Sequence, residues 1–197
     1  DTLTSINNLG SLLQDQGKLD EAEPLLREAL EGMRGKLGDE HPSTLGSINN
    51  LGFLLRIQGK LDEAEPLLRE ALEVCRRKLG NEHPSTLSPM SNLGNVLRVQ
   101  GKLAEAEPLL REALEVFRRK LGNEHSGTLK SMNYLGVLLM DQGKYDEAEA
   151  LLREALEGSR RQLGNEHPNT LMAKQSLDAL LKEKQESESP APDPPSD

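Results

Sequence analysis

Four histidines recur at one position of the sequence, 42 residues apart, and regularly spaced imidazoles suggest a metal site. They are His41, His83, His125 and His167. Ligands of zinc must converge to about 2 Å from the ion, whereas packed helices lie roughly 10 Å apart. Equivalent residues of successive helical layers are therefore too far apart to share an ion. We expect these histidines to be structural and no metal to be bound.

Carboxylates and one cysteine are the other residues that could do chemistry. Glu63 and Glu65 belong to a Glu-Ala-Glu triplet that recurs along the chain, but residues two apart on a helix diverge by roughly 200°. Cys75 has no histidine near it in the sequence. The other copies hold Met33, Phe117 and Ser159 at this position. Because a glycine-rich phosphate loop is also absent, we expect no catalytic residue, no cofactor and no enzymatic activity.

The composition excludes two classes of partner. The chain has 33 acidic and 24 basic residues, a net charge of -9, and no basic run, which argues against nucleic acid because phosphate binding needs clustered cations. No apolar run approaches the roughly 18 residues of a membrane span. A single cysteine is typical of an intracellular, cytoplasmic protein. The chain starts at Asp1 rather than Met, as a fragment would.

A 42-residue repeat organises the whole sequence. Thr-Leu begins each copy, and the same register carries Leu-Gly and Gln-Gly-Lys. The Thr-Leu dipeptides start at residues 2, 44, 86, 128 and 170. Such self-similarity indicates an array in which each unit packs on its neighbours. We expect repeats at about 1–42, 43–84, 85–126 and 127–168, a capping helix at 169–184, and a disordered acidic tail rich in Pro and Ser at 185–197.

Each copy predicts a helical hairpin. Apolar residues of 45–58 recur at steps of three and four, and Gly59 then ends the helix. A second helix follows, with Pro66 expected in its first turn or at its edge. Pairs such as Glu65 with Arg69 and Glu73 with Arg77 have the favourable i,i+4 order. The segment Leu-Gly-Asn-Glu-His-Pro, residues 79–84, then links one hairpin to the next.

The spacing resembles the tetratricopeptide repeat. Ile48, the pair Leu51 and Gly52, Leu55, Ala64, Leu68 and Ala71 match its pattern, whereas Arg76 replaces its proline, so the second helix should be about a turn longer. The 42-residue unit with Glu-Ala-Glu-Pro-Leu and Arg-Glu-Ala-Leu-Glu is similar to the repeats of kinesin light chain. The resemblance implies an all-α, right-handed superhelix (an α-solenoid) of four hairpins and a capping helix, and a cytoplasmic scaffold with a link to the cytoskeleton.

The resemblance also implies a peptide-binding groove. In this family, positions 2, 5, 9, 12 and 13 of each first helix face the concave side. From this set we expect nine residues, here called the groove set, to bind the ligand: Asn49, Phe53, Arg56, Ser91, Asn95, Arg98, Lys130, Asn133 and Val137. Arg56, Arg98 and Lys130 give the groove a basic character in an acidic chain. Arginine offers paired donors to carboxylates.

The copies differ most at these groove positions. Between residues 43–84 and 85–126 the chain has 10 differences in 42, 4 of them among the 5 groove positions. Between 85–126 and 127–168 all 5 groove positions differ, against 11 of the other 37. Drift of exposed residues is the simpler explanation, but the outward Glu and Arg faces have drifted less.

The sequence thus predicts an adaptor that holds an extended acidic peptide, with no nucleic acid or membrane partner. Two alternatives remain open. The array could be the sensor or regulatory part of a larger signalling protein, or it could self-associate through the uncapped helical hairpin at its N-terminal end.

Overall fold

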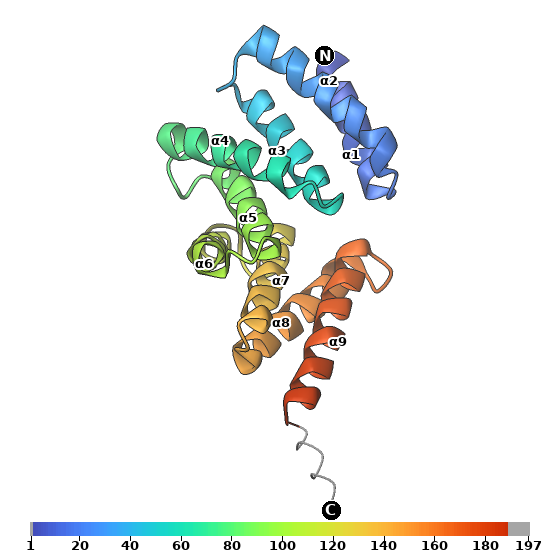
Figure 1. Ribbon diagram of the computed structural model, residues 1–197, viewed down its shortest axis with the longest axis vertical. Helices are drawn as coiled ribbons and strands as arrows, with labels where there is room; N and C mark the ends of the chain where they lie inside the picture. Colours follow the sequence, from blue (N-terminus) through green and yellow to red (C-terminus); the bar gives the residue numbers. More distant parts are fainter. Residues whose placement is uncertain (1, 189–197) are drawn as a thin grey trace, which may run out of the picture. The chain divides into compact units, whose positions relative to one another are not determined.

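The computed structural model describes residues 2–188, and every regular element within them is an α-helix (Figure 1). The elements are α1 (Thr2–Asp15), α2 (Leu19–Leu37), α3 (Pro42–Ile57), α4 (Leu61–Leu79), α5 (Pro84–Val99), α6 (Leu103–Leu121), α7 (Ser126–Asp141), α8 (Tyr145–Leu163) and α9 (Pro168–Glu188). The chain divides into two compact units, Asp1–Phe117 and Arg118–Asp197. The helical part has the predicted all-α solenoid organisation of successive hairpins.

Glycine makes the turn inside each hairpin. Gly59 follows the end of α3 with a φ of 76°, a conformation that favours residues without a Cβ. Its N–H donates to the carbonyl of Arg56 at 3.1 Å, and the N–H of Lys60 donates to the carbonyl of Leu55 at 2.9 Å. These bonds satisfy carbonyls that the helix end would leave unpaired. The predicted helix end at Gln-Gly-Lys is confirmed.

The histidines cap helices. Nδ1 of His83 accepts a hydrogen bond from the N–H of Ser85 at 3.1 Å, and Pro84 opens α5, where the missing N–H costs little. His41, His125 and His167 accept from the residue two further along in the same way. In the linker before α5, the hydroxyl of Thr86 also donates to the carbonyl of Gly80 at 2.8 Å. No group of three or more potential metal-ligating residues gathers anywhere in residues 2–188.

The two helices of a hairpin meet at a glycine. A Cβ built on Gly52 in α3 would lie 2.7 Å from Cγ of Leu68 in α4. Gly94 and Leu110 make the same close approach in unit 1, and Gly136 and Leu152 make it in unit 2. The absence of a side chain at this position therefore sets how closely the first and second helices pack.

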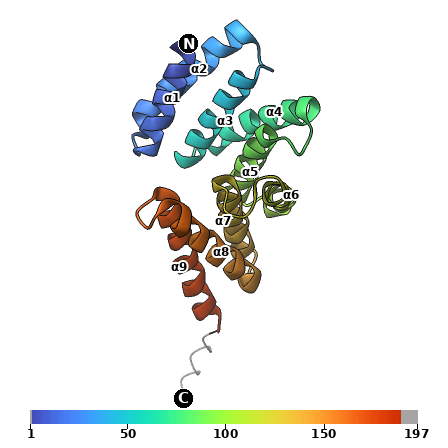
Figure 2. The same ribbon diagram turned by 180° about the vertical axis from the view of Figure 1, so that it is seen from behind.

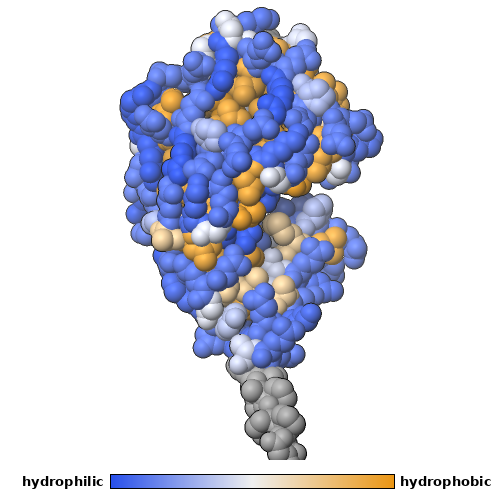
Figure 3. Space-filling view, viewed as in Figure 1, coloured by the Kyte–Doolittle hydropathy of each residue, from blue (hydrophilic) through white to orange (hydrophobic). Residues whose placement is uncertain are grey.

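Leu and Ala dominate the interior, as the composition indicates. Ile48, Leu55 and Ala64 have no exposed surface. Hydrophilic side chains cover most of the face that Figure 3 displays, and hydrophobic ones reach the surface in patches between helices. Val99 and Leu171 remain 45% and 42% exposed. Both side chains therefore leave apolar surface accessible to a ligand.

The first helices of successive hairpins lie side by side within each unit. In unit 1, α3 contacts both α1 and α5, and in unit 2, α7 contacts α9. α3 also packs against the second helices on either side of it, α2 and α4 (Figure 2), and α7 packs against α8. Within each unit the first helices therefore form a layer, which carries the groove positions of that unit.

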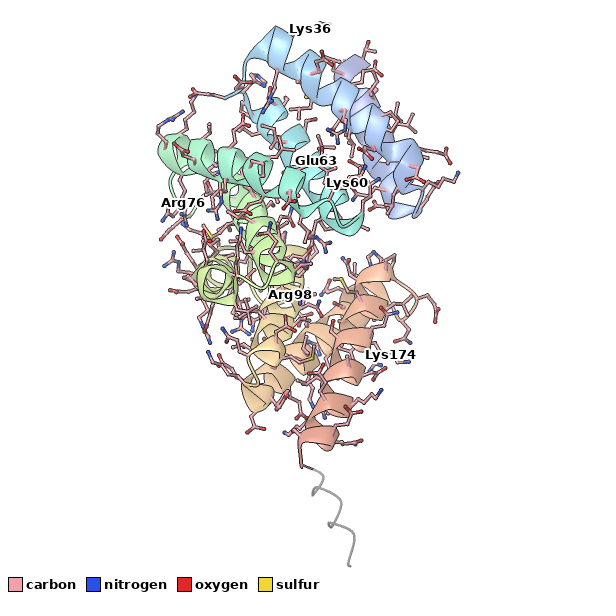
Figure 4. The ribbon with its side chains drawn as sticks, viewed as in Figure 1. Lys36, Lys60, Glu63, Arg76, Arg98 and Lys174 are labelled. Atoms are coloured by element: carbon pink, nitrogen blue, oxygen red, sulfur yellow. The ribbon has the colours of Figure 1, made fainter. Side chains whose placement is uncertain are left out.

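Ion pairs join the second helices of neighbouring hairpins. Arg27 of α2 pairs with Glu63 of α4 at 2.7 Å, and Lys60 pairs with Glu23 at the same distance. Lys60 and Glu63 both lie at the N-terminal end of α4 (Figure 4). The predicted pair of Glu65 with Arg69 is confirmed at 2.8 Å. The prediction for Glu73 was wrong, because Arg77 reaches across to Glu40 in the preceding linker instead.

We expect these pairs to make stability depend on acid pH. The hydrogen bond from Lys60 lowers the pKa of Glu23 from 4.5 to about 2, and Lys102 does the same for Glu65. A carboxyl with a depressed pKa stabilises the fold above its unfolded pKa and loses that contribution as the pH falls towards its folded pKa. Each should contribute about 1–2 kcal/mol that disappears between pH ~4.5 and ~2.

Urea unfolding measured across that pH range tests this. The Glu23→Gln, Glu65→Gln double variant should have a flatter profile than the unmodified chain. Equal slopes for the two proteins would show that these carboxylates are not responsible.

Pro66 lies slightly deeper in α4 than the first turn or its edge, where the sequence predicted it. Because α4 begins at Leu61, Pro66 belongs to the second turn rather than the first. It leaves the carbonyl of Asp62 without its i+4 donor. Asp62 is exposed, so water can bond to that carbonyl. The helix continues past Arg76 to Leu79, as expected from the absence of the family's proline there.

The last helix is longer than predicted. α9 runs from Pro168 to Glu188, four residues beyond the expected end at 184. Lys184 anchors this extra turn, because its Nζ lies 2.7 Å from Asp146 and 3.1 Å from Glu149 of α8. Residues 185–188 are therefore helical rather than part of a disordered tail. The remainder of the predicted tail, 189–197, lies outside the described residues.

Candidate peptide-binding groove

In unit 1, the two arginines of the groove set are held by neighbouring side chains. The guanidinium of Arg56 lies over the ring of Phe53, 4.8 Å from its centroid. Nε of Arg98 donates to Oδ1 of Asn95 at 3.0 Å. The two residues of each pair belong to the same helix, which is α3 for the first pair and α5 for the second. Since the partners fix the two guanidinium planes, less conformational entropy is lost when a ligand binds.

Some of the groove set is deeper than the helical pattern suggests. Ser91 is 5% exposed and Asn95 is 3% exposed. Asn49, Phe53, Arg56 and Arg98 are half-buried. The buried Asn95 therefore serves to orient Arg98, and Arg98 offers the more accessible polar atoms for a ligand.

Asparagines connect adjacent first helices. Nδ2 of Asn92 in α5 donates to Oδ1 of Asn49 in α3 at 2.9 Å. Nδ2 of Asn50 in α3 donates to Oγ of Ser11 in α1 at 3.2 Å. The sequence reasoning missed Asn92 because it lies outside the family's groove positions. Its recurrence at Asn8 and Asn50 was the available signal.

A hollow of about 370 Å³ opens among α1, α3 and α5. Five groove positions meet there: Thr4, Asn7, Gly46, Asn49 and Ser88. Its lining has no charged side chain. Oδ1 of Asn7 and Oγ of Ser47 are buried there without a hydrogen-bond partner in the described part of the chain. This hollow can therefore satisfy uncharged polar groups, such as peptide N–H groups, better than ions.

Unit 2 holds the other three members of the groove set on α7. Nζ of Lys130 lies 5.5 Å from the ring centroid of Tyr134, and Val137 is half-buried. Asn133 is 4% exposed, and its Oδ1 has no hydrogen-bond partner within residues 2–188. Lys130 over Tyr134 parallels Arg56 over Phe53, a cation supported by an aromatic face in each unit.

Cys75 is inert in this structure. Its side chain is 1% exposed, and burial raises the pKa of its thiol. A thiol that stays protonated is a poor nucleophile.

A membrane-spanning helix needs both length and low polarity, and none of the helices in the described residues combines the two.

Comparison with known proteins agrees with the fold. Tetratricopeptide repeat models match residues 43–119, 86–157 and 127–184, and a second such model matches residues 2–43. No curated protein matches the chain.

Kinesin light chain repeats are among the solved structures with similar folds. Two crystal structures of nearly identical tetratricopeptide-like repeats of a kinesin light chain from Podosopora anserina are 28% identical to this chain. One has a TM-score of 0.72 and covers 94% of this chain and 87% of its own, and the other has 0.71, 94% and 88%. BtubC (BKLC) from P. vanneervenii, at 23% identity and a TM-score of 0.65, covers 98% and 83% and supports the fold alone. The chain belongs to the tetratricopeptide repeat family, with the 42-residue unit of the kinesin light chain type.

Proposed function

We propose that this protein-interaction scaffold binds an extended acidic peptide along its first helices. The observation that carries the proposal is the pair of supported guanidinium groups in unit 1, Arg56 over Phe53 and Arg98 on Asn95. Guanidinium groups bind carboxylates through two parallel hydrogen bonds. A net charge of -9 repels acidic ligands elsewhere on the chain. Local cations on the groove face therefore select where such a ligand binds.

The uncharged hollow among α1, α3 and α5 supports an extended ligand. Asn7 and Ser47 offer buried oxygen atoms without partners, which can accept hydrogen bonds from peptide N–H groups. Ile57 and Val99, 42% and 45% exposed, occupy the last groove position of α3 and α5 and offer apolar contacts. We expect the ligand to alternate carboxylates with apolar side chains. In unit 2, considered by itself, Lys130 and Val137 offer a cation and apolar surface of the same kinds.

Selection from a random peptide library on the full chain tests this proposal. We expect the enriched peptides to carry several Asp or Glu residues and to bind more weakly as salt concentration rises. A parallel selection on the Arg56→Glu, Arg98→Glu variant should lose these sequences. Enrichment of basic or uncharged peptides on the unmodified chain would contradict the proposal.

The similar structures support a proposal for the cellular setting. Since they are kinesin light chain repeats, we expect the scaffold to work in the cytoplasm, with the cytoskeleton as its setting. Fluorescence microscopy of the tagged chain, alone and with an enriched peptide fused to a reporter, would test whether both proteins gather on filaments.

A further inference from the structure

Two Arg–Asn pairs in this chain each hold a glutamate from the next second helix. Nη2 of Arg76 donates to Oε2 of Glu112 at 2.7 Å, and Nδ2 of Asn81 donates to Oε1 of the same residue at 2.8 Å. One donor lies at the end of α4 and the other in the linker that follows. Both carboxylate oxygens are thereby bound. We call this arrangement, an Arg and an Asn that hold one glutamate side chain, a glutamate clamp.

The second clamp is in unit 2. Arg118 donates to Oε2 of Glu154 at 2.6 Å, and Asn123 donates to Oε1 at 3.1 Å. The spacing within the clamp is unchanged, five residues from Arg to Asn. The structure thus shows twice, with the same donor atoms, which chemical group this pair binds. That group is the carboxylate of a glutamate on an amphipathic helix.

A third copy of the clamp lacks its glutamate. Arg160 at the end of α8 and Asn165 in the next linker repeat the spacing, and both line a hollow of about 440 Å³. Neither side chain makes an ion pair or hydrogen bond with any residue of the described range 2–188. Counting 42 residues on from Glu154 leads to residue 196, which is a serine. The sequence therefore does not supply the carboxylate at the repeated position.

Two further features of the hollow point to a ligand. Thr170 is 2% exposed, yet its hydroxyl has no hydrogen-bond partner in the described part of the chain. The equivalent hydroxyls of Thr44, Thr86 and Thr128 each donate to the carbonyl of the glycine that ends the preceding helix. Lys174 of α9 adds a second cation to the lining (Figure 4).

Apolar surface borders the same hollow. Leu171 lines it and is 42% exposed. The equivalent leucines of the preceding three repeats, Leu45, Leu87 and Leu129, are 7%, 0% and 4% exposed. The leucine of this repeat position is thus normally buried within its hairpin, and in α9 it is accessible to a helix from outside.

Glu166 adds the last element of recognition. The equivalent residues of two earlier linkers, Glu40 and Glu124, pair with Arg77 and Arg161. Each of these arginines lies seven residues, or two turns of one helix face, beyond the clamped-position glutamate, Glu70 or Glu154. A ligand helix that places Glu in the third clamp would therefore bring a residue seven positions later to Glu166. Complementarity predicts a basic residue there.

We propose that Arg160 and Asn165 bind a glutamate on an amphipathic helix of a partner protein. The helix carries Leu and Ala on the face towards Leu171, and an Arg or Lys seven residues after the glutamate, which pairs with Glu166. Residues 151–161, which include Leu151, Glu154 and Arg161, have this pattern. The site lies in unit 2, on the end of α8, the last linker and α9, and its residues do not belong to the groove set.

A synthetic peptide of residues 145–163 with blocked ends is the probe. Titrated into the full chain by fluorescence anisotropy, it should bind measurably, and its Glu154→Gln form should bind at least tenfold more weakly. The Arg160→Gln protein should show the same tenfold loss for the unmodified peptide. Lys18→Gln removes one positive charge from an exposed turn of unit 1 and should bind like the unmodified chain.

A charge exchange separates recognition from a general loss of binding. The Glu166→Arg protein should bind the peptide weakly and recover affinity for the Arg161→Glu peptide. Equal affinity of the Arg160→Gln protein and the unmodified chain would overturn the proposal, as would no binding of the unmodified peptide. Sedimentation of the chain alone should show a monomer. A dimer that Arg160→Gln dissociates would overturn the assignment to a separate partner, because a second copy would then fill the clamp.

Discussion

Replacing Gly52 by alanine is expected to lower the free energy of unfolding by about 1–3 kcal/mol. The added methyl group would lie 2.7 Å from Cγ and 2.8 Å from Cδ2 of Leu68, a side chain with no exposed surface. Because Leu68 has no space to retreat, α3 and α4 must move apart or the leucine must leave its preferred rotamer. The gain of about 1 kcal/mol from the higher helix propensity of alanine offsets only part of this cost.

Gly46 provides the matched control on the same helix. A Cβ at Gly46 would meet nothing within 4 Å, and the residue is exposed. Gly46→Ala should therefore raise the free energy of unfolding by up to about 1 kcal/mol. The same chemical change should have opposite signs six residues apart.

Urea denaturation of the two single variants gives both values. A loss of stability in both variants would mean that α3 tolerates no substitution, and similar gains in both would contradict the close approach of α3 and α4. Gly46 also lines the hollow among the first helices. Binding data for Gly46→Ala would therefore report on the groove without a loss of stability.

The helices of each repeat could be predicted because glycines in the sequence mark where each helix ends. Gly59 and Gly80 end helices in the sequence, and both have positive φ in the structure. Pro66 was expected in the first turn or at its edge and lies in the second, because a proline fixes only its own φ and removes one N–H. The helix start at Leu61 depends instead on how Gly59 and Lys60 turn the chain.

Contacts between side chains of different repeats could not be predicted from the sequence. The pairing of Asn92 with Asn49, 43 residues away, depends on how α5 lies against α3. Arg77 likewise forms its ion pair with Glu40 rather than Glu73, because the linker that contains Glu40 lies beside the end of α4. A helical pattern gives the direction of a side chain but not how deeply it lies, so Asn95 was grouped with Arg98 as a contact residue. The structure instead buries Asn95 as a support.

The clamp shows what repetition can add once geometry is known. Arg76, Arg118 and Arg160 look equivalent in the sequence, and so do the asparagines that follow them. Only the structure distinguishes the two that hold a glutamate from the one that lines an open hollow. The same comparison identifies the chemistry that would fill it.

Reversing the charge of Arg56 and Arg98 together is expected to weaken binding of an acidic library-selected peptide by at least about 100-fold. Hydrogen bonds to charged groups contribute about 1.5–3 kcal/mol each, and losing two of them exceeds the roughly 2.7 kcal/mol that a 100-fold change represents. The new carboxylates would also repel the ligand. The Arg56→Gln, Arg98→Gln variant should fall between the two proteins, because it removes the attraction without adding repulsion.

The control must separate a local contact from the overall charge. Lys18→Glu with Lys36→Glu changes the net charge by the same amount at two exposed sites outside the groove set. If the ligand contacts Arg56 and Arg98, this control should bind within about threefold of the unmodified chain at physiological salt, where charges beyond roughly 8 Å are screened. Equal losses in the two double variants, measured by calorimetry, would assign the effect to net charge and remove the two arginines from the binding site. Thermal unfolding of every variant shows whether a loss of binding reflects a loss of fold.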